Sequence, residues 1–209
     1  MENPFSFTAV VDEPAFCNRE AEQKSLASLI EASQNVLLYS HRRFGKTSLI
    51  LKVFNQLKGI TPIYVDLYGT TSIPDFIRAA LTGISKAEPK PQRLMKLVRE
   101  TITSFTASFS LDPVTGLPSV SPQLAPDMKA APLEDVFRLA HAVATKKKMV
   151  IAFDEFQEVA RYGGDAFEKQ LRKHIQQHRN IAYIFSGSQK HLIVEMFNDA
   201  KRAFYRQAA

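Results

Sequence analysis

Apolar residues follow two alternating patterns along the chain. Short runs that are apolar almost throughout, at positions 35–39, 61–67, 149–153 and 181–185, predict buried strands. Apolar residues at helical spacing predict helices at about 19–32, 46–58, 73–84, 133–145 and 189–197, and another helix that Asp165 and Glu168 open as a D-x-x-E capping box. Buried strands that alternate with helices are typical of a parallel sheet covered on both faces. The pattern therefore predicts a three-layer α/β fold.

The middle of the chain breaks this pattern. Positions 85–132 hold seven of the eleven prolines and no long apolar run. Within them the stretch "TSFTASFSL" alternates apolar and hydroxyl side chains, and "DPVTG" follows it with residues that favour a turn. We interpret positions 85–131 as a β-hairpin insertion. Phe105 and Phe109 on its apolar face are expected to pack the hairpin rather than to stack on nucleic-acid bases.

Composition narrows the class of protein. The chain has 209 residues, 45% of them hydrophobic, which suits one domain over 1–209. A net charge of +6 permits contact with nucleic acid or another anionic ligand without requiring it. Cys17 is the only cysteine, which excludes an intrachain disulfide. The apolar runs are too short to span a bilayer, and the N-terminus does not read as a signal peptide, so we expect a cytoplasmic protein without membrane contact.

The stretch "NVLLYSHRRFGKTSLI" at positions 35–50 resembles a phosphate-binding loop, for which the usual pattern is G-x-x-x-x-G-K-[ST]. Ser40 stands where the first glycine is usual. Gly45 would let the backbone approach a phosphate, Lys46 would reach the β- and γ-phosphates, and the Thr47 hydroxyl would bind Mg²⁺. The alternative is a Gly-Lys-Thr tripeptide that only begins a helix. The predicted nucleotide-binding residues here are Ser40, His41, Arg42, Arg43, Phe44, Gly45, Lys46, Thr47 and Ser48.

Two later stretches supply possible partners for this loop. In "MVIAFDE" a buried strand ends in Asp154, which would hold a water of the Mg²⁺ ion, and in Glu155, which would polarise the attacking water. The strand "IAYIFSGS" ends in Ser186 and Ser188, which could lie beside the γ-phosphate. Two solvated acids and a small-residue turn are the plainer alternatives. The pairing of the acids with the loop favours the functional interpretation.

These motifs together resemble the AAA+-related, archaeal-type P-loop ATPases of the STAND group. "FCNREAE", "YSHRRFGKTSLI", "VIAFDEFQE" and "IFSGS" carry the resemblance, which covers positions 14–206. It implies ATP as the nucleotide, tolerance of Ser40, and a place for Arg42 and Arg43 in the loop. It also implies that Phe16, Arg19 and Glu20 lie near the adenine, although a role in the start of the first helix would explain them too. Members continue into a helical lid and often a winged-helix domain, and neither can be assigned here.

We therefore expect an ATP-binding protein in which Mg²⁺-dependent hydrolysis drives a switch or a motor. The two alternatives are a regulatory module with little hydrolysis and a nucleic-acid-binding protein gated by ATP. Self-association is possible, with Arg172 or Arg179 reaching a neighbour's nucleotide. His174 and His178 have a spacing that metals can use, but a solvated or partner-facing helix surface is the simpler interpretation. The run Lys146–Lys148 is expected to be a solvated rim.

Overall fold

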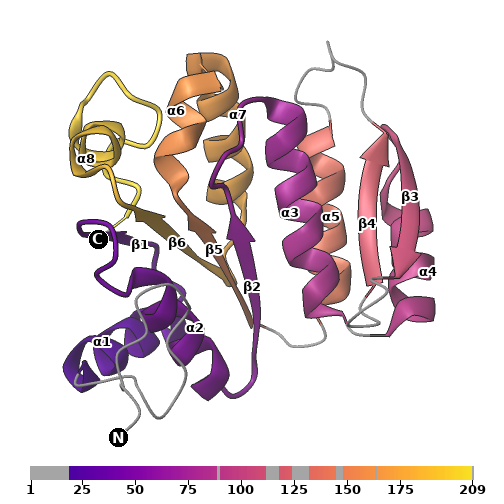
Figure 1. Ribbon diagram of the computed structural model, residues 1–209, viewed down its shortest axis with the longest axis horizontal. Helices are drawn as coiled ribbons and strands as arrows, with labels where there is room; N and C mark the ends of the chain where they lie inside the picture. The colour runs from indigo at the N-terminus through magenta and orange to yellow at the C-terminus, as the bar shows by residue number, and fades with distance from the viewer. Residues whose placement is uncertain are drawn as a thin grey trace, which may run out of the picture.

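The computed structural model describes residues 19–88, 90–111, 118–123, 132–144, 148–162 and 164–208. Figure 1 shows their helices and strands. In chain order these are α1 (Glu20–Glu31), β1 (Val36–Tyr39), α2 (Lys46–Gln56), β2 (Ile60–Asp66), α3 (Ile73–Ala87), α4 (Pro91–Thr101), β3 (Thr106–Leu111), β4 (Pro118–Gln123), α5 (Pro132–Val143), β5 (Lys148–Asp154), the 3-10 helix η2 (Phe156–Glu158), α6 (Val159–Tyr162), α7 (Gly164–Gln177), β6 (Ile181–Gly187) and α8 (Lys190–Asn198).

Four strands form the predicted parallel sheet, in the order β1-β6-β5-β2. The register aligns Leu38 with Ser186 and Asp66 with Asp154, so the carboxyl ends of the strands meet at one edge. Strand β2 lies at one side of the sheet, where it includes Pro62. Proline has no N–H to donate, and it is tolerated in such an edge strand. The loops that follow the carboxyl ends are therefore brought together by the sheet itself.

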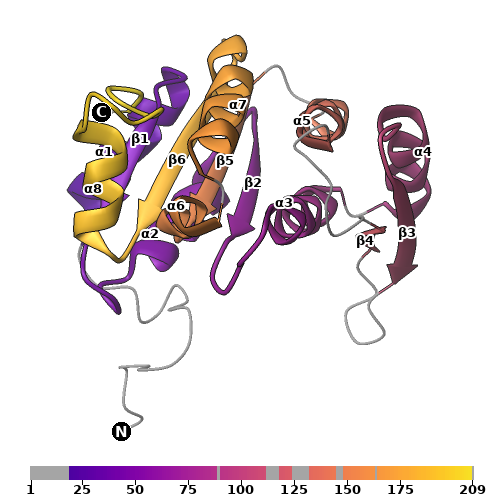
Figure 2. The same cartoon turned by 90° about the horizontal axis from the view of Figure 1, so that it is seen from above.

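Helices cover both faces of this sheet. Alternate residues of β5 divide between two cores, because successive side chains of a strand point to opposite faces. Val150 and Ala152 pack with α1 and α2, whereas Ile151 and Phe153 pack with α3, α5, α7 and α8. Helices α1 and α2 group with β1 and α8 at one end of the molecule in two perpendicular views (Figures 1 and 2). The three-layer α/β prediction is confirmed.

The predicted hairpin is present as β3 and β4, which pair antiparallel in a separate two-stranded sheet. Helix α4 was not predicted, because the surrounding prolines suggested a break. Pro91 instead occupies the first turn, where its missing N–H costs no helical hydrogen bond. The hairpin and α4, here called the hairpin block, lie beyond α3 at the far end from β1 (Figures 1 and 2). Phe105 and Ala107 pack against the larger core, and the "DPVTG" stretch lies outside the described residues.

Two other local predictions are corrected. Asp165 does not open α7, since the helix begins at Gly164 and the Asp165 carboxylate instead pairs with Lys169. Glu168 is buried and pairs with Arg202 from the segment after α8, so no capping box forms. The short helices η2 and α6 directly after β5 were not anticipated. In the part of the chain that the structure describes, no helix has the length and apolar character needed to cross a membrane.

Candidate functional site

The phosphate-loop motif joins β1 to α2 at the carboxyl edge of the sheet. Gly45 immediately precedes α2 with φ of +68°, in the left-handed region that glycine adopts without strain. Arg43 is also left-handed, with φ of +66°. Such a conformation is costly for a residue with a side chain and is concentrated at functional sites. The loop is thus held in a specific shape ahead of the helix, as a phosphate cradle requires.

Lys46 lies inside this loop rather than in solvent. Its side chain is 6% exposed, and its Nζ donates to the carbonyl oxygens of Ser40 and His41 at 3.2 and 3.3 Å. The loop therefore curls around the ammonium group. Since α2 begins at Lys46, the positive end of the helix points into the same place. An anion seated in the loop would meet both charges.

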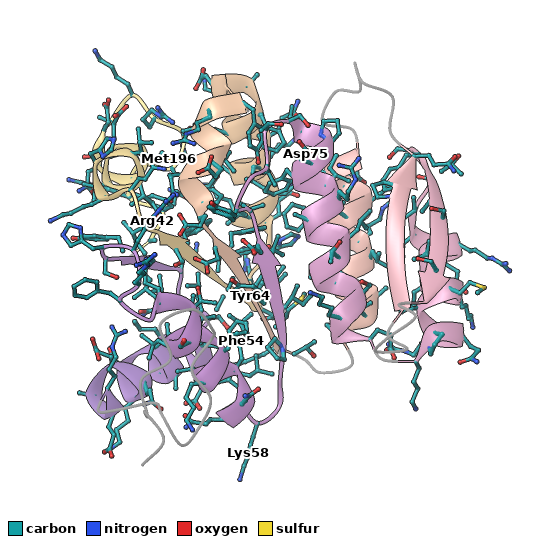
Figure 3. All side chains as sticks on the ribbon, in the orientation of Figure 1. Arg42, Phe54, Lys58, Tyr64, Asp75 and Met196 are labelled. Carbon is teal, nitrogen blue, oxygen red and sulfur yellow. The ribbon has the colours of Figure 1, made fainter. Side chains whose placement is uncertain are left out.

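Thr47 and Asp154 come from different strand–loop units and meet directly. The Thr47 hydroxyl donates to Asp154 Oδ2 at 2.6 Å across 107 positions of sequence. A second hydroxyl, from Tyr64, donates to the same oxygen at 2.7 Å, and the Glu155 N–H donates to Oδ1 at 3.0 Å. Figure 3 shows Tyr64 on β2, between α2 and α3. Burial and the nearby Asp154 carboxylate raise the pKa of the Tyr64 hydroxyl, which therefore stays a proton donor.

This arrangement fits a magnesium ion. Thr47 gives its hydrogen to Asp154, which leaves the lone pairs of its oxygen for a metal. Asp154 is 3% exposed, and none of its partners among the described residues is a cation. A buried carboxylate without a positive partner is unfavourable, and hard oxygen donors are the ligands that Mg²⁺ prefers. Thr47 and Asp154 would hold the ion. The described residues contain no group of three or more His, Cys, Asp or Glu side chains that could hold a metal by themselves.

Glu155 is held in a defined position next to these residues. It is left-handed, with φ of +54°, and its Oε2 accepts from the Ser188 hydroxyl at 2.7 Å and from the Gln157 side-chain amide. The Arg42 guanidinium approaches the same Ser188 hydroxyl at 3.5 Å, which links the phosphate loop to the end of β6. A Cβ at Gly187 would lie 2.4 Å from Gln157 Oε1 and 2.6 Å from Ile193 Cδ1, so a larger residue there would displace these two side chains. Gln157 was missed by sequence reasoning.

The other predicted residues occupy different places around the loop and the end of β6. Arg19 donates to the Phe44 carbonyl at 2.9 Å, so the segment before α1 is tied to the loop, and Phe44 itself is 64% exposed. Ser48 is buried in the first turn of α2. Ser186 is fully buried in β6, and its hydroxyl has no hydrogen-bond partner among the described residues. The predicted Phe16 contact lies outside the described residues.

Three weaker candidates lie away from this site. Arg179 follows α7 and precedes β6, so it lies at the opposite edge of the sheet from Asp154. His174 and His178 are not solvated as expected, because both pack half-buried against the Phe137 ring of α5. A structural role explains both histidines.

Solved structures share the fold described above. No protein-family model matches the chain, and no curated protein matches it. A Walker-type ATPase of Pyrococcus abyssi is 22% identical, with a TM-score of 0.63 over 99% of this chain and 56% of that chain. The Orc1 protein of Aeropyrum pernix, solved in complex with DNA, is 19% identical, with a TM-score of 0.55 over 92% of this chain and 44% of that chain. Cdc6p from Pyrobaculum aerophilum is 11% identical, with a TM-score of 0.53 over 98% of this chain and 47% of that chain.

The fold is that of the P-loop ATPases. At these identities the likeness concerns the fold and not the chemistry, and the chain spans about half the length of the solved structures that it matches. Within the P-loop fold, the sequence motifs had named the loop, Asp154 and Glu155. Tyr64 was missed, because its contact with Asp154 depends on the pairing of β2 with β5, which no local motif reveals.

Proposed function

We propose that this chain binds ATP and hydrolyses it with Mg²⁺. The observation that carries the proposal is the 2.6 Å hydrogen bond from Thr47 to Asp154, which joins the phosphate loop to the acidic strand end. A chance Gly-Lys-Thr tripeptide would not need a buried acid from another strand beside it. The buried position of Lys46 within the loop gives independent support.

Each residue then has a role set by its contacts. The loop and Lys46 would bind the β- and γ-phosphates, with Thr47 and Asp154 at the ion. A bound Mg²⁺ ion would neutralise charge on the phosphate oxygens. Glu155 would orient and polarise the attacking water, while Ser188 fixes the Glu155 carboxylate and Ser186 lines the end of β6.

The test of binding compares two lysines. Lys46→Ala should weaken ATP binding at least tenfold, about 1.4 kcal/mol, with the fold intact. Lys58→Ala is the matched control, because Lys58 is exposed and points away from the protein (Figure 3). Calorimetry that finds equal ATP affinity in both variants would overturn the assignment of the loop.

Turnover separates hydrolysis from binding alone. Glu155→Gln should keep ATP affinity and lose most of the steady-state phosphate release. If the wild-type chain binds ATP but releases no phosphate, the regulatory-module alternative is favoured. Competition between ATP and GTP tests the choice of adenine, for which the STAND-group resemblance is the support. That group membership and a cytoplasmic location remain parts of this proposal.

Nucleic-acid binding is the second candidate function. The net charge of +6 and the likeness to an Orc1 protein solved with DNA favour it. Binding through phosphates weakens steeply with salt. Fluorescence anisotropy with duplex DNA at low and high salt, with and without ATP, tests it. Binding that is absent at low salt would exclude this candidate.

A further inference from the structure

The Tyr64 hydroxyl makes a contact that the phosphate-loop and acidic-strand motifs do not explain. It donates to Asp154 Oδ2 at 2.7 Å from the neighbouring strand. We propose that Tyr64 is a positioning residue, which fixes the Asp154 carboxylate so that the site can hold Mg²⁺. The proposal rests on the proposed function and adds a residue to it.

The sheet sets this contact. Tyr64 pairs with Ala152, two residues before Asp154, and side chains two apart on a strand point to the same face. The Tyr64 ring packs against the core that contains Ala152 and helix α2. Thr47 lies in the first turn of that helix. The strand pairing and the helix thus deliver two hydroxyl groups to one carboxylate oxygen.

The Tyr64 hydroxyl determines which oxygen of the Asp154 carboxylate stays free. A carboxylate oxygen accepts about two hydrogen bonds, so Thr47 and Tyr64 together fill Oδ2. Oδ1 accepts only the Glu155 N–H among the described residues and keeps one free direction. The water of a bound ion would therefore be received at Oδ1. Without the Tyr64 hydroxyl, the carboxylate could rotate and offer either oxygen.

The hydroxyl can be removed while the Tyr64 ring, which packs against the core of Ala152 and α2, is kept. On its other side Tyr64 borders a cavity of about 380 Å³, which Asp66 and one face of α3 also line. A Tyr64→Phe change therefore removes the hydroxyl and leaves the ring against its core. Outer contacts that orient a metal ligand typically change metal affinity by about 10–100-fold.

The experiment measures metal affinity directly. Wild-type protein, Tyr64→Phe and Tyr68→Phe are titrated with Mn²⁺ in the presence of a non-hydrolysable ATP analogue, and free Mn²⁺ is followed by electron paramagnetic resonance. Tyr68 is the matched control, since it is 68% exposed and borders the same cavity. Affinity for the analogue is also measured in EDTA, where no metal contributes.

We expect Tyr64→Phe to bind Mn²⁺ at least tenfold more weakly, with unchanged analogue affinity in EDTA and an unchanged Tyr68→Phe control. Equal or tighter Mn²⁺ binding by Tyr64→Phe overturns the inference while leaving the proposed function in place. A matching loss in EDTA assigns Tyr64 to folding and also overturns it. If wild-type protein binds neither analogue nor metal, the proposed function fails and the inference fails with it.

Discussion

Two buried aspartates show how differently the two ends of the molecule are built. Asp135 on α5 faces the hairpin block, and Asp154 ends β5 at the candidate site; they are 1% and 3% exposed. Asp135 accepts hydrogen bonds from Thr103 and Ser104 and also pairs with Arg138. Asp154 has only neutral donors among the described residues. Asp135 has neutral and charged partners within the fold, whereas Asp154 has no positive partner in the described part of the chain.

The contrast extends to the surroundings of each acid. Near Asp154, Glu155 is left-handed, and the buried atoms Gln157 Oε1 and Ser186 Oγ have no partner in the described part of the chain. Native proteins leave few buried polar atoms unpaired, and strain gathers where function requires it. Burial acts to raise the pKa of the Asp135 carboxyl, but the Ser104, Thr103 and Arg138 donors outweigh it and hold the pKa low. Asp135 therefore serves stability, and Asp154 is suited to receive a cation.

The largest expected effect is the loss of stability when Asp135, the structural acid, is replaced. Asp135→Ala should lower the free energy of unfolding by about 3 kcal/mol, because it removes a buried acceptor and leaves the part-buried N–H groups of Thr103 and Ser104 and the Arg138 guanidinium without their partner. ATP affinity should not change. Urea denaturation measures the loss, and Asp165→Ala is the control, since among the described residues that exposed acid pairs with Lys169 at i,i+4, a contact worth about 0.5 kcal/mol. Equal effects of the two changes would remove the distinction drawn for Asp135.

Asp154→Asn should give the reverse result. We expect phosphate release to fall at least a hundredfold, about 2.7 kcal/mol of barrier. Stability should stay level or rise, because the change removes a buried charge that has no cation beside it in the described residues. Thermal unfolding and a turnover assay on the same preparation measure both. A loss of stability as large as that of Asp135→Ala would make Asp154 a second structural acid.

The same contrast separates what the sequence could predict from what it could not. Gly45, Lys46 and Asp154 lie in local patterns whose chemistry can be recognised from spacing, and the sheet needed only strand-like apolar runs. Tyr64 and Gln157 reach the site through strand pairing and through the turn after β5, which depend on tertiary structure. No local pattern marks Tyr64, and Gln157 lies in "VIAFDEFQE" without a spacing that reveals its contact with Glu155.

In the hairpin block and the acid beside it, the sequence concealed both a helix and a structural role. Its alternation predicted β3, but the prolines concealed α4, because a proline in the first helical turn resembles a helix breaker in sequence. Asp135 was read only as part of a helix. Its role appears when α5 is placed beside Thr103 and Ser104. Contacts between a single acid and residues far away in the sequence leave no periodic pattern in that sequence.

Acid pH should weaken the structural side of the molecule through three half-buried histidines. Burial, with smaller contributions from the neighbouring charges of His141 and His174, lowers the pKa of His178 from 6.5 to about 4. Burial also lowers the pKa of His141 and of His174, where the nearby Glu134 opposes it and Lys173 adds to it. As the pH falls, these histidines therefore take up protons in the unfolded chain before they do so in the folded chain. Stability is complete above pH 6.5 and falls as the pH approaches about 4.

The histidines are half exposed, so solvent screening reduces the effect to roughly 1–2 kcal/mol. Urea titrations between pH 7 and pH 4.5 measure it. His178→Phe should flatten the pH dependence, although it also loses the contact with the Tyr183 hydroxyl. His191→Gln, at an exposed position on α8, is the control. A slope that survives His178→Phe unchanged would place the titration elsewhere.

The smallest expected effect compares two left-handed glycines. Gly45 and Gly59 have φ of +68° and +75°, and an added Cβ would meet nothing closer than 3.8 Å at either position. Alanine at each should therefore cost the same backbone strain, about 1 kcal/mol of unfolding free energy. Only Gly45→Ala should also weaken ATP binding, because its methyl group stands where the loop backbone would approach a phosphate. Gly59 follows α2 at the opposite end of that helix, so Gly59→Ala reports strain alone. Urea titrations measure the loss of stability in each variant, and calorimetry measures the loss of ATP affinity. Equal ATP affinity in both variants would mean that Gly45 shapes the loop without admitting a ligand.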